Sequence, residues 1–245
     1  MFQHIVRIGH ELRGALAEAG FFVSLALRSL KFWHRDPPVR NVADLVRFVE
    51  TRAKFVAQIT LFGYLKTRMG TRYTQMFVDE TYARSVNIAK WEIYLSCLGD
   101  AAAFAVARTG RDGQGTDAEM CAIALHVLNT ILDGEDVPDV RPQGFNDIRT
   151  AFDTRARTLP WRECAEGETA FRGSLEALMY WAPIADELKE RDTPFVRNSM
   201  RFKWKKVRDD IESLLDADAV LADWRDGKVD PVPPAPLTAR HRPQE

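Results

Sequence analysis

The chain of 245 residues is poor in cysteine and has no long apolar run. Its three cysteines, Cys97, Cys121 and Cys164, are scattered and form no Cys-x-x-Cys motif. An odd, scattered set argues against a disulfide framework and fits a reducing compartment. No run of about 18 uncharged apolar residues predicts a membrane-spanning helix, and charged residues interrupt what a secretory signal would need as its apolar core. We expect a cytoplasmic protein, with docking at the inner face of a membrane as an extension.

Local signatures of catalysis are also missing. The chain contains no Gly-x-Ser-x-Gly and no His-Glu-x-x-His motif, and its five histidines and three cysteines never cluster at metal-ligand spacing. The glycine-rich stretch 108–120 has no lysine before Thr116 and follows an alanine-rich helix, so it predicts a connector instead of a phosphate-binding loop. We therefore expect no metal and no cofactor, and we favour a non-enzymatic protein over an enzyme.

Apolar residues recur at helical spacing along most of the chain, and no alternation typical of a β-strand exceeds four residues. The pattern predicts an all-α, multi-helix bundle with two long central helices, 41–69 and 78–107. Glycines at 110, 113 and 115 are expected to break the chain after the second long helix. Thr193 and Pro194 have the spacing of an N-cap and first-turn pair, which predicts a late helix from there to Leu215.

We expect one helical domain over residues 1–225, with a subdivision at 134–144 as an open alternative because that stretch is the best internal linker. Residues 226–245 are rich in proline and poor in large apolar side chains, which predicts a disordered tail.

Charge is unevenly distributed along the chain. Residues 1–78 carry 12 Lys and Arg against 5 Asp and Glu, a net of +7, whereas residues 79–245 carry 22 against 30, a net of −8. The two sum to the net charge of −1. Any anionic partner is therefore expected at the basic N-terminal part.

Basic side chains gather where the first long helix ends. Lys66, Arg68 and Arg72 surround Gly70, so this stretch is either an anion site or a corner between two helices. Glycine suits the exit from a helix, and basic residues near a helix C-terminus complement its dipole. We favour the corner, with Arg72 bridging to the acids that open the next helix.

Asp100 interrupts an otherwise apolar stretch of the second long helix. A buried carboxylate must be neutral, paired or hydrogen-bonded, and Arg52 is the partner we expect. We favour a structural polar clamp over a catalytic acid. In the alternative, a ligand pocket between the long helices would be lined by Arg52, Tyr64, Tyr94 and Asp100.

The segment from Phe21 to Trp33 has a wide apolar arc and a narrow polar stripe. It is either a buried bundle helix, which we favour, or a helix that contacts a membrane or a partner. In the second case its contact residues are Phe21, Phe22, Arg28, Lys31 and Trp33.

The stretch 197–208 carries six basic residues and no acid, and its basic side chains recur on one face of a helix. Acids follow directly, so we expect a solvated face of a packed helix and rank nucleic-acid binding last.

Two function classes follow. We favour a non-enzymatic helical adaptor or assembly protein, which binds a protein partner or itself and docks on a membrane surface or membrane-protein partner through its basic N-terminal part. The alternative is a small-molecule enzyme or ligand-binding protein with a pocket between the long helices.

Overall fold

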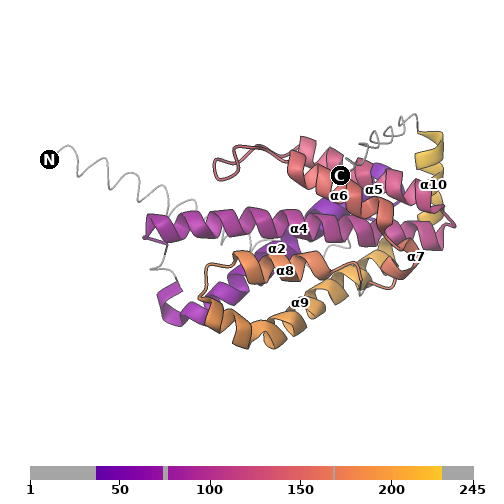
Figure 1. Ribbon diagram of the computed structural model, residues 1–245. Helices are drawn as coiled ribbons and strands as arrows, with labels where there is room; N and C mark the ends of the chain where they lie inside the picture. Colours follow the sequence, from indigo (N-terminus) through magenta and orange to yellow (C-terminus); the bar gives the residue numbers. More distant parts are fainter. Residues whose placement is uncertain (1–36, 74–76, 168, 228–245) are drawn as a thin grey trace, which may run out of the picture. The chain divides into compact units, whose positions relative to one another are not determined.

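A computed structural model describes residues 37–73, 77–167 and 169–227, and those from Pro38 onward belong to one compact unit (Figure 1). The described part of the chain contains helices and no strand. An isolated parallel bridge joins Val39 to Leu215. The predicted all-α bundle is confirmed for these residues. The elements are α2 Val42–Met69, the 3-10 helix η2 Gly70–Arg72, α4 Glu80–Asp112, α5 Asp117–Asp133, α6 Asn146–Thr158, α7 Trp161–Cys164, α8 Arg172–Trp181, α9 Asp186–Leu214 and α10 Ala217–Asp226.

Two long helices occupy the centre, as predicted. Helix α2 has 28 residues and α4 has 33. They pack on each other; α4 also contacts α5, α7, α8 and α10, and α2 also contacts α5, α9 and α10. In the view of Figure 1, α5 lies on one side of α4 and α8 on the other. Every residue from 97 to 107 is buried, because small side chains let neighbouring helices approach α4 on all sides.

The ends of α2 follow the sequence signals. The Asn41 side chain accepts a hydrogen bond from the Asp44 N–H at 2.8 Å, which satisfies one of the free donors of the first turn. Gly70 ends the helix with φ at +54°, a backbone conformation that costs glycine little. The expected corner after α2 is therefore present.

Helix α4 runs further than predicted, to Asp112 instead of residue 107. The expectation that Gly110 breaks the chain is wrong. A Cβ on Gly110 would lie 1.9 Å from Met120 Sδ, so the missing side chain makes room for α5. Close packing explains this glycine, and the helix ends three residues later at Gly113.

Helix α5 begins with a capping box. Thr116 Oγ1 accepts from the Glu119 N–H, and the Glu119 carboxylate accepts from the Thr116 N–H at 2.8 Å. Arg225 of α10 donates to the same carboxylate at 2.7 Å. Hydrogen bonds from Arg225 and from the Thr116 backbone lower the pKa of Glu119 to about 2. One side chain therefore caps α5 and ties it to α10.

We expect Glu119→Gln to lower the free energy of unfolding at pH 7 by about 1 kcal/mol, the usual size of a capping contribution. The lowered folded pKa means that the carboxylate stabilises the protein above the ordinary value of 4.5, and that this contribution is lost as pH falls from 4.5 towards 2. Urea unfolding at pH 7 and pH 3 measures both effects. The difference between the two proteins should shrink at pH 3, and an unchanged difference would contradict the assignment.

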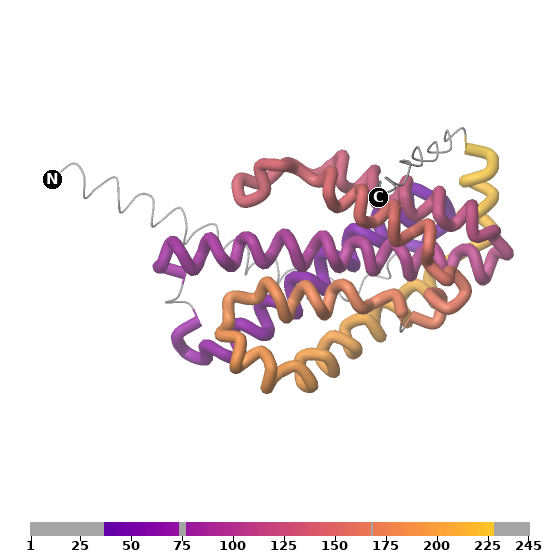
Figure 2. Tube along the Cα trace, viewed as in Figure 1, coloured from indigo at the N-terminus to yellow at the C-terminus, as the bar shows by residue number. Residues whose placement is uncertain are grey.

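Helix α9 begins earlier than predicted. It starts at Asp186, so Thr193 is not an N-cap and Pro194 lies inside the helix. Proline lacks the N–H that would bond to the residue four places earlier. Thr193 Oγ1 donates to the Lys189 carbonyl at 2.9 Å, one turn back. The axis of α9 is bent, as Figure 2 shows, and an internal proline is a usual cause of such a bend.

The connection between α5 and α6 contains no helix but holds a buried arginine. Arg141, 3% exposed, forms ion pairs with Glu92 of α4 and Asp147 of α6, and its Nε donates to the Gly144 carbonyl at 2.9 Å. These contacts fasten the stretch that we interpreted as a linker. The domain limits at 1–225 and the tail at 226–245 extend past the described residues and stay predictions. Among the described helices, none is long and apolar enough to cross a membrane.

Candidate functional site

The corner residues Lys66, Arg68 and Arg72 have different surroundings. Arg68 forms an ion pair with Asp192 of α9, and Tyr64 Oη donates to the same carboxylate at 2.9 Å. Asp192 is 4% exposed, so Arg68 joins α2 to α9. Lys66 and Arg72 are exposed and form no ion pair with any described residue, so the expected bridge from Arg72 to the start of α4 is wrong. The anion site stays a prediction, in which Arg68 would have to exchange Asp192 for the anion.

Asp100 is fully buried and has a different partner from the one expected. Its Oδ1 accepts from Arg155 Nη1 of α6 at 2.8 Å, and its Oδ2 accepts from the backbone N–H of Ser174 at 2.7 Å. The prediction of Arg52 as the partner is wrong. Burial raises the pKa of Asp100, while Arg155 and the Ser174 N–H act in the opposite direction. Both oxygens are occupied, which fits the structural clamp.

Asp100 also caps α8 from another helix. Phe171, the N-cap residue of α8, makes no side-chain cap, and the carboxylate bonds to the N–H of Ser174 in the first turn instead. A Cβ on Gly173 would lie 3.2 Å from Asp100 Oδ1, so glycine gives the carboxylate room to approach. Trp204 Nε1 of α9 donates to Ser174 Oγ at 3.1 Å. The clamp therefore joins α4, α6, α8 and α9.

Two of the predicted pocket residues bind partners elsewhere. Arg52 Nε lies 3.0 Å from a carboxylate oxygen of Asp210 on α9. Tyr94 Oη donates to Glu135 Oε1 at 2.8 Å, and Lys54 Nζ lies 2.7 Å from the same oxygen. Burial raises the pKa of Tyr94, and Glu135 adds to the effect.

The four predicted pocket residues therefore do not share a site. Arg52 and Tyr64 contact different acids of α9, Tyr94 contacts the start of the α5–α6 connection, and Asp100 contacts α6 and α8. Each polar group already has a protein partner, so none of them is presented to a common ligand.

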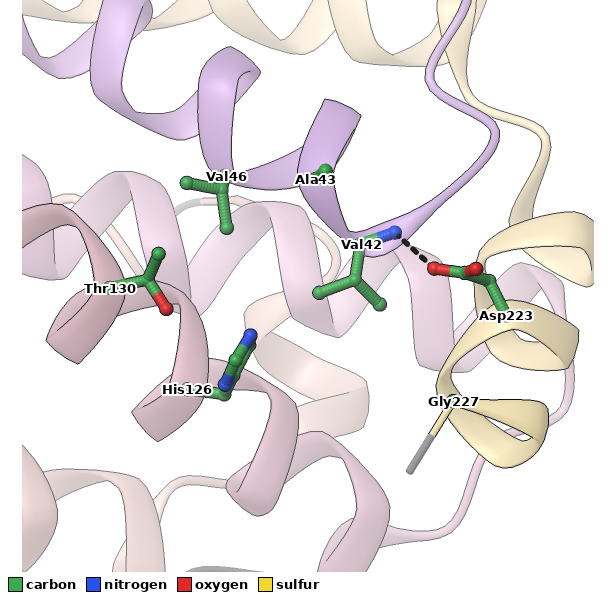
Figure 3. A pocket seen from close by; sticks show the side chains of 7 residues that line it. All are labelled: Val42, Ala43, Val46, His126, Thr130, Asp223 and Gly227. Carbon is green, nitrogen blue, oxygen red and sulfur yellow. Dashed lines mark hydrogen bonds between the residues drawn. The ribbon is translucent and has the colours of Figure 1, made fainter. Parts of the chain in front are cut away.

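A groove of about 400 Å³ lies elsewhere, between α2, α5 and α10 (Figure 3). Its walls are mainly apolar, and Asp223 accepts from the Val42 N–H at 2.9 Å at one side. His126 is half-buried, and burial lowers its pKa. The neutral imidazole and apolar walls suit a small apolar group better than an anion. The lining residues are Val42, Ala43, Val46, His126, Thr130, Asp223 and Gly227.

The described residues hold no group of three His, Cys, Asp or Glu side chains placed to bind a metal ion. Cys97 and Cys164 are buried, and burial raises the pKa of both thiols, which disfavours the reactive thiolate.

Large exposed apolar side chains gather on α9. Phe195 is 76% exposed and Phe202 72%, and Leu188 is also exposed. We call the stripe formed by these three residues the outer stripe of α9. The opposite face of α9 is buried and includes Val196, Met200, Val207 and Ile211, and sequence reasoning did not single out the exposed stripe. The signal that it missed is the seven-residue spacing of the three large side chains.

Two further aromatic residues end α8 near the start of α9. Tyr180 is 74% exposed, Trp181 is also exposed, and their rings make an edge contact. Lys189 Nζ of α9 donates to the Tyr180 carbonyl at 3.1 Å, which places this pair beside the start of the outer stripe. Aromatic side chains of this kind are enriched at protein interfaces.

The acids that follow the basic stretch of α9 serve as its partners. Lys205 pairs with Asp209 at 2.6 Å, and Lys206 pairs with Asp210 at 3.0 Å. The predicted solvated face is therefore present, and Lys205 and Lys206 pair with acids of the same helix. Comparison of the chain with protein-family models, curated proteins and solved structures finds no match. The function is therefore inferred from the contacts described above.

Proposed function

We propose that the protein is a non-enzymatic helical adaptor or assembly protein that binds its partner through the outer stripe of α9. The observation that carries the proposal is the exposure of Phe195 and Phe202 on a helix whose opposite face is already buried. Monomeric proteins seldom leave aligned large apolar side chains exposed without an interaction to make.

The polar interior supports the same proposal. Asp100, Asp192 and Arg141 are buried, and each forms an ion pair with a residue of another helix. Buried charges held in this way are structural links more often than catalytic groups. The small-molecule alternative would need a site other than the one that Arg52, Tyr64, Tyr94 and Asp100 were expected to form.

Docking on a membrane surface or membrane-protein partner belongs to the same proposal. Its contact residues Phe21, Phe22, Arg28, Lys31 and Trp33 lie outside the described residues, so this part rests on the sequence pattern alone.

The test is affinity capture from a native lysate that is separated into soluble and membrane fractions. We expect Phe195→Ser with Phe202→Ser to weaken partner binding by about 100-fold or more, because each aromatic anchor contributes on the order of 2 kcal/mol. The matched control is Val78→Ser with Val137→Ser, which alters two exposed valines elsewhere. Identical captured sets from the stripe variant and the control would overturn the proposal.

A further inference from the structure

The groove between α2, α5 and α10 lies beside the point where the chain leaves α10. Gly227, the residue that follows this helix, is one of the residues that line the groove. Its backbone has φ at −71° and ψ at 129°, which is close to the polyproline II conformation. The chain therefore leaves α10 in an extended conformation beside the groove, and residues 228–245 follow directly.

The walls of the groove combine apolar side chains with two hydrogen-bonding groups. Val42, Ala43 and Val46 of α2 form one wall (Figure 3). His126 and Thr130 lie one turn apart on α5 and form another. Neither of these two side chains makes a hydrogen bond with another described residue, so the imidazole N–H and the hydroxyl are both available as donors. An apolar segment with free carbonyl acceptors complements both features.

The sequence that follows Gly227 has both properties. Residues 229–237 read Val-Asp-Pro-Val-Pro-Pro-Ala-Pro-Leu, and the stretch from Pro231 to Leu237 carries no charge. Each proline supplies a carbonyl acceptor and no N–H donor. Proline also fixes its own φ near −65° and favours an extended conformation in the residue before it, so the composition predicts polyproline II. A polyproline II segment makes no internal hydrogen bonds, which leaves its carbonyls free to accept from a groove.

We propose that residues 229–235 of the same chain occupy this groove, with Val229 and Val232 as the apolar anchors. Polyproline II has three residues per turn, so side chains three positions apart share one side and lie about 9 Å apart. Val229, Val232 and Ala235 have this spacing. Their shared side packs against the apolar wall that α2 provides.

The α5 side of the groove fits the backbone of such a segment. Proline-rich segments bind grooves that contain aromatic rings. His126 supplies an imidazole ring, and Trp224 of α10 lies against it with ring centroids 5.7 Å apart. The His126 N–H and the Thr130 hydroxyl donate to carbonyls of the bound segment. The two donors thus give the contact a direction that apolar packing alone does not.

The short connection to α10 favours this occupant over one that diffuses freely. Val232 is five residues from Gly227, and five residues span at most about 18 Å. A short tether gives an effective concentration on the order of 1 mM. A segment whose free form binds with a dissociation constant of about 0.1 mM then fills the groove in about nine molecules of ten. A similar segment of another molecule at micromolar concentration competes poorly with it.

This contact is separate from the outer stripe of α9, because α9 contributes no lining residue to the groove. Occupation of the groove and binding of a partner through the stripe are therefore independent of each other. The proline-rich composition that predicts a disordered tail is also the composition that such a groove binds. The groove thus gives part of that tail a place to bind.

Photochemical cross-linking of the full chain tests the placement. Benzoylphenylalanine in place of Val232 should react on irradiation with residues 42–46 and 126–130, which mass spectrometry identifies after digestion. The same probe in place of Val137, exposed on the α5–α6 connection, is the control and should not label these residues. Cross-links from position 232 that avoid both stretches would overturn the proposal.

Isotope labelling distinguishes the chain's own segment from that of a second copy. In an equimolar mixture of labelled and unlabelled protein, each cross-link should join two peptides with the same label. Random pairing of labels would assign the groove to a second copy and overturn the proposal.

A matched pair of substitutions tests whether the groove itself holds the segment. Ala43→Trp fills the groove and should lower the labelling of residues 126–130 at least fivefold. Ala151→Trp alters an exposed alanine of α6 and should leave the labelling unchanged. Equal labelling in the two variants would show that the segment does not bind in the groove.

Binding of a free peptide tests whether the groove is already filled. The probe is a synthetic peptide of residues 228–240, measured by isothermal titration calorimetry with the full chain. It should bind the variant Val229→Ser with Val232→Ser about tenfold more tightly than the original protein, because the tethered competitor is weakened. A peptide with the same two serines is the control and should bind neither protein. Equal affinity for the two proteins would show an open groove, and no binding to the variant would show that the groove does not recognise the segment; either result overturns the proposal.

Discussion

Replacing Asp100 with alanine is expected to lower the free energy of unfolding by about 3 kcal/mol. The substitution leaves Arg155 Nη1 and the Ser174 N–H without their acceptor, removes the cap of α8 and opens a small cavity. Removing one member of a buried pair costs about 3–5 kcal/mol, and the lower end applies because Arg155 is partly exposed and can reach water. Urea unfolding followed by circular dichroism measures the loss.

Two further substitutions test the physical reason for that loss. Asp100→Asn keeps the shape but supplies one acceptor where two donors approach, so it should also destabilise the protein, by less than alanine does. Asp112→Ala on the same helix removes a carboxylate that is 36% exposed, and it should cost less than about 1 kcal/mol. Equal losses for Asp100→Ala and Asp112→Ala would show that the clamp does not stabilise the fold.

A second large effect is expected at Asp192. Asp192→Ala should lower the free energy of unfolding by about 2–3 kcal/mol, because Tyr64 Oη loses its acceptor in a buried position and Arg68 loses its ion pair. The substitution weakens the packing of α2 against the first turns of α9, which precede Pro194. Thermal unfolding of the variant and the original protein gives the comparison.

A double-substitution cycle tests whether these groups act together. Tyr64→Phe alone should cost about 1 kcal/mol, the usual net value of one hydrogen bond. In the Asp192→Ala background it should cost almost nothing, since the acceptor is already gone. Additive losses would contradict a direct interaction between Tyr64 and Asp192.

Much of the helical fold could be predicted from local signals. Asn41, Gly70 and the Thr116–Glu119 capping box act on their own neighbours in the chain, so their roles can be read from spacing alone. The same reasoning failed at Gly110 and Pro194. There, contacts with distant helices outweigh the local preference: Met120 packs against Gly110, and Asp192 is held by α2 just before the proline.

The partners of buried charges could not be predicted from the sequence. Asp100 was recognised as buried because it interrupts an apolar stretch, but its partner lies 55 positions away on α6, and no local pattern marks that residue. Arg141 was missed because its surroundings, rich in Gly, Pro and Asp, indicated an exposed linker. Pairing of this kind depends on which helices become neighbours, and one sequence does not contain that information in a local form.

The bridge between Val39 and Leu215 joins the segment before α2 to the turn between α9 and α10. The Val39 N–H donates to the Leu214 carbonyl at 2.8 Å, and the Asp216 N–H donates to the Val39 carbonyl at 2.9 Å. Gly227, the last described residue, lines the same groove as Val42 and Ala43, so the two ends of the described chain lie close together. A circular permutant that links Gly227 to Pro38 and begins in the exposed loop at Val137 would keep the same neighbours for every helix. Native-like unfolding of this permutant would show that the arrangement of the helices does not depend on the order in which they are synthesised.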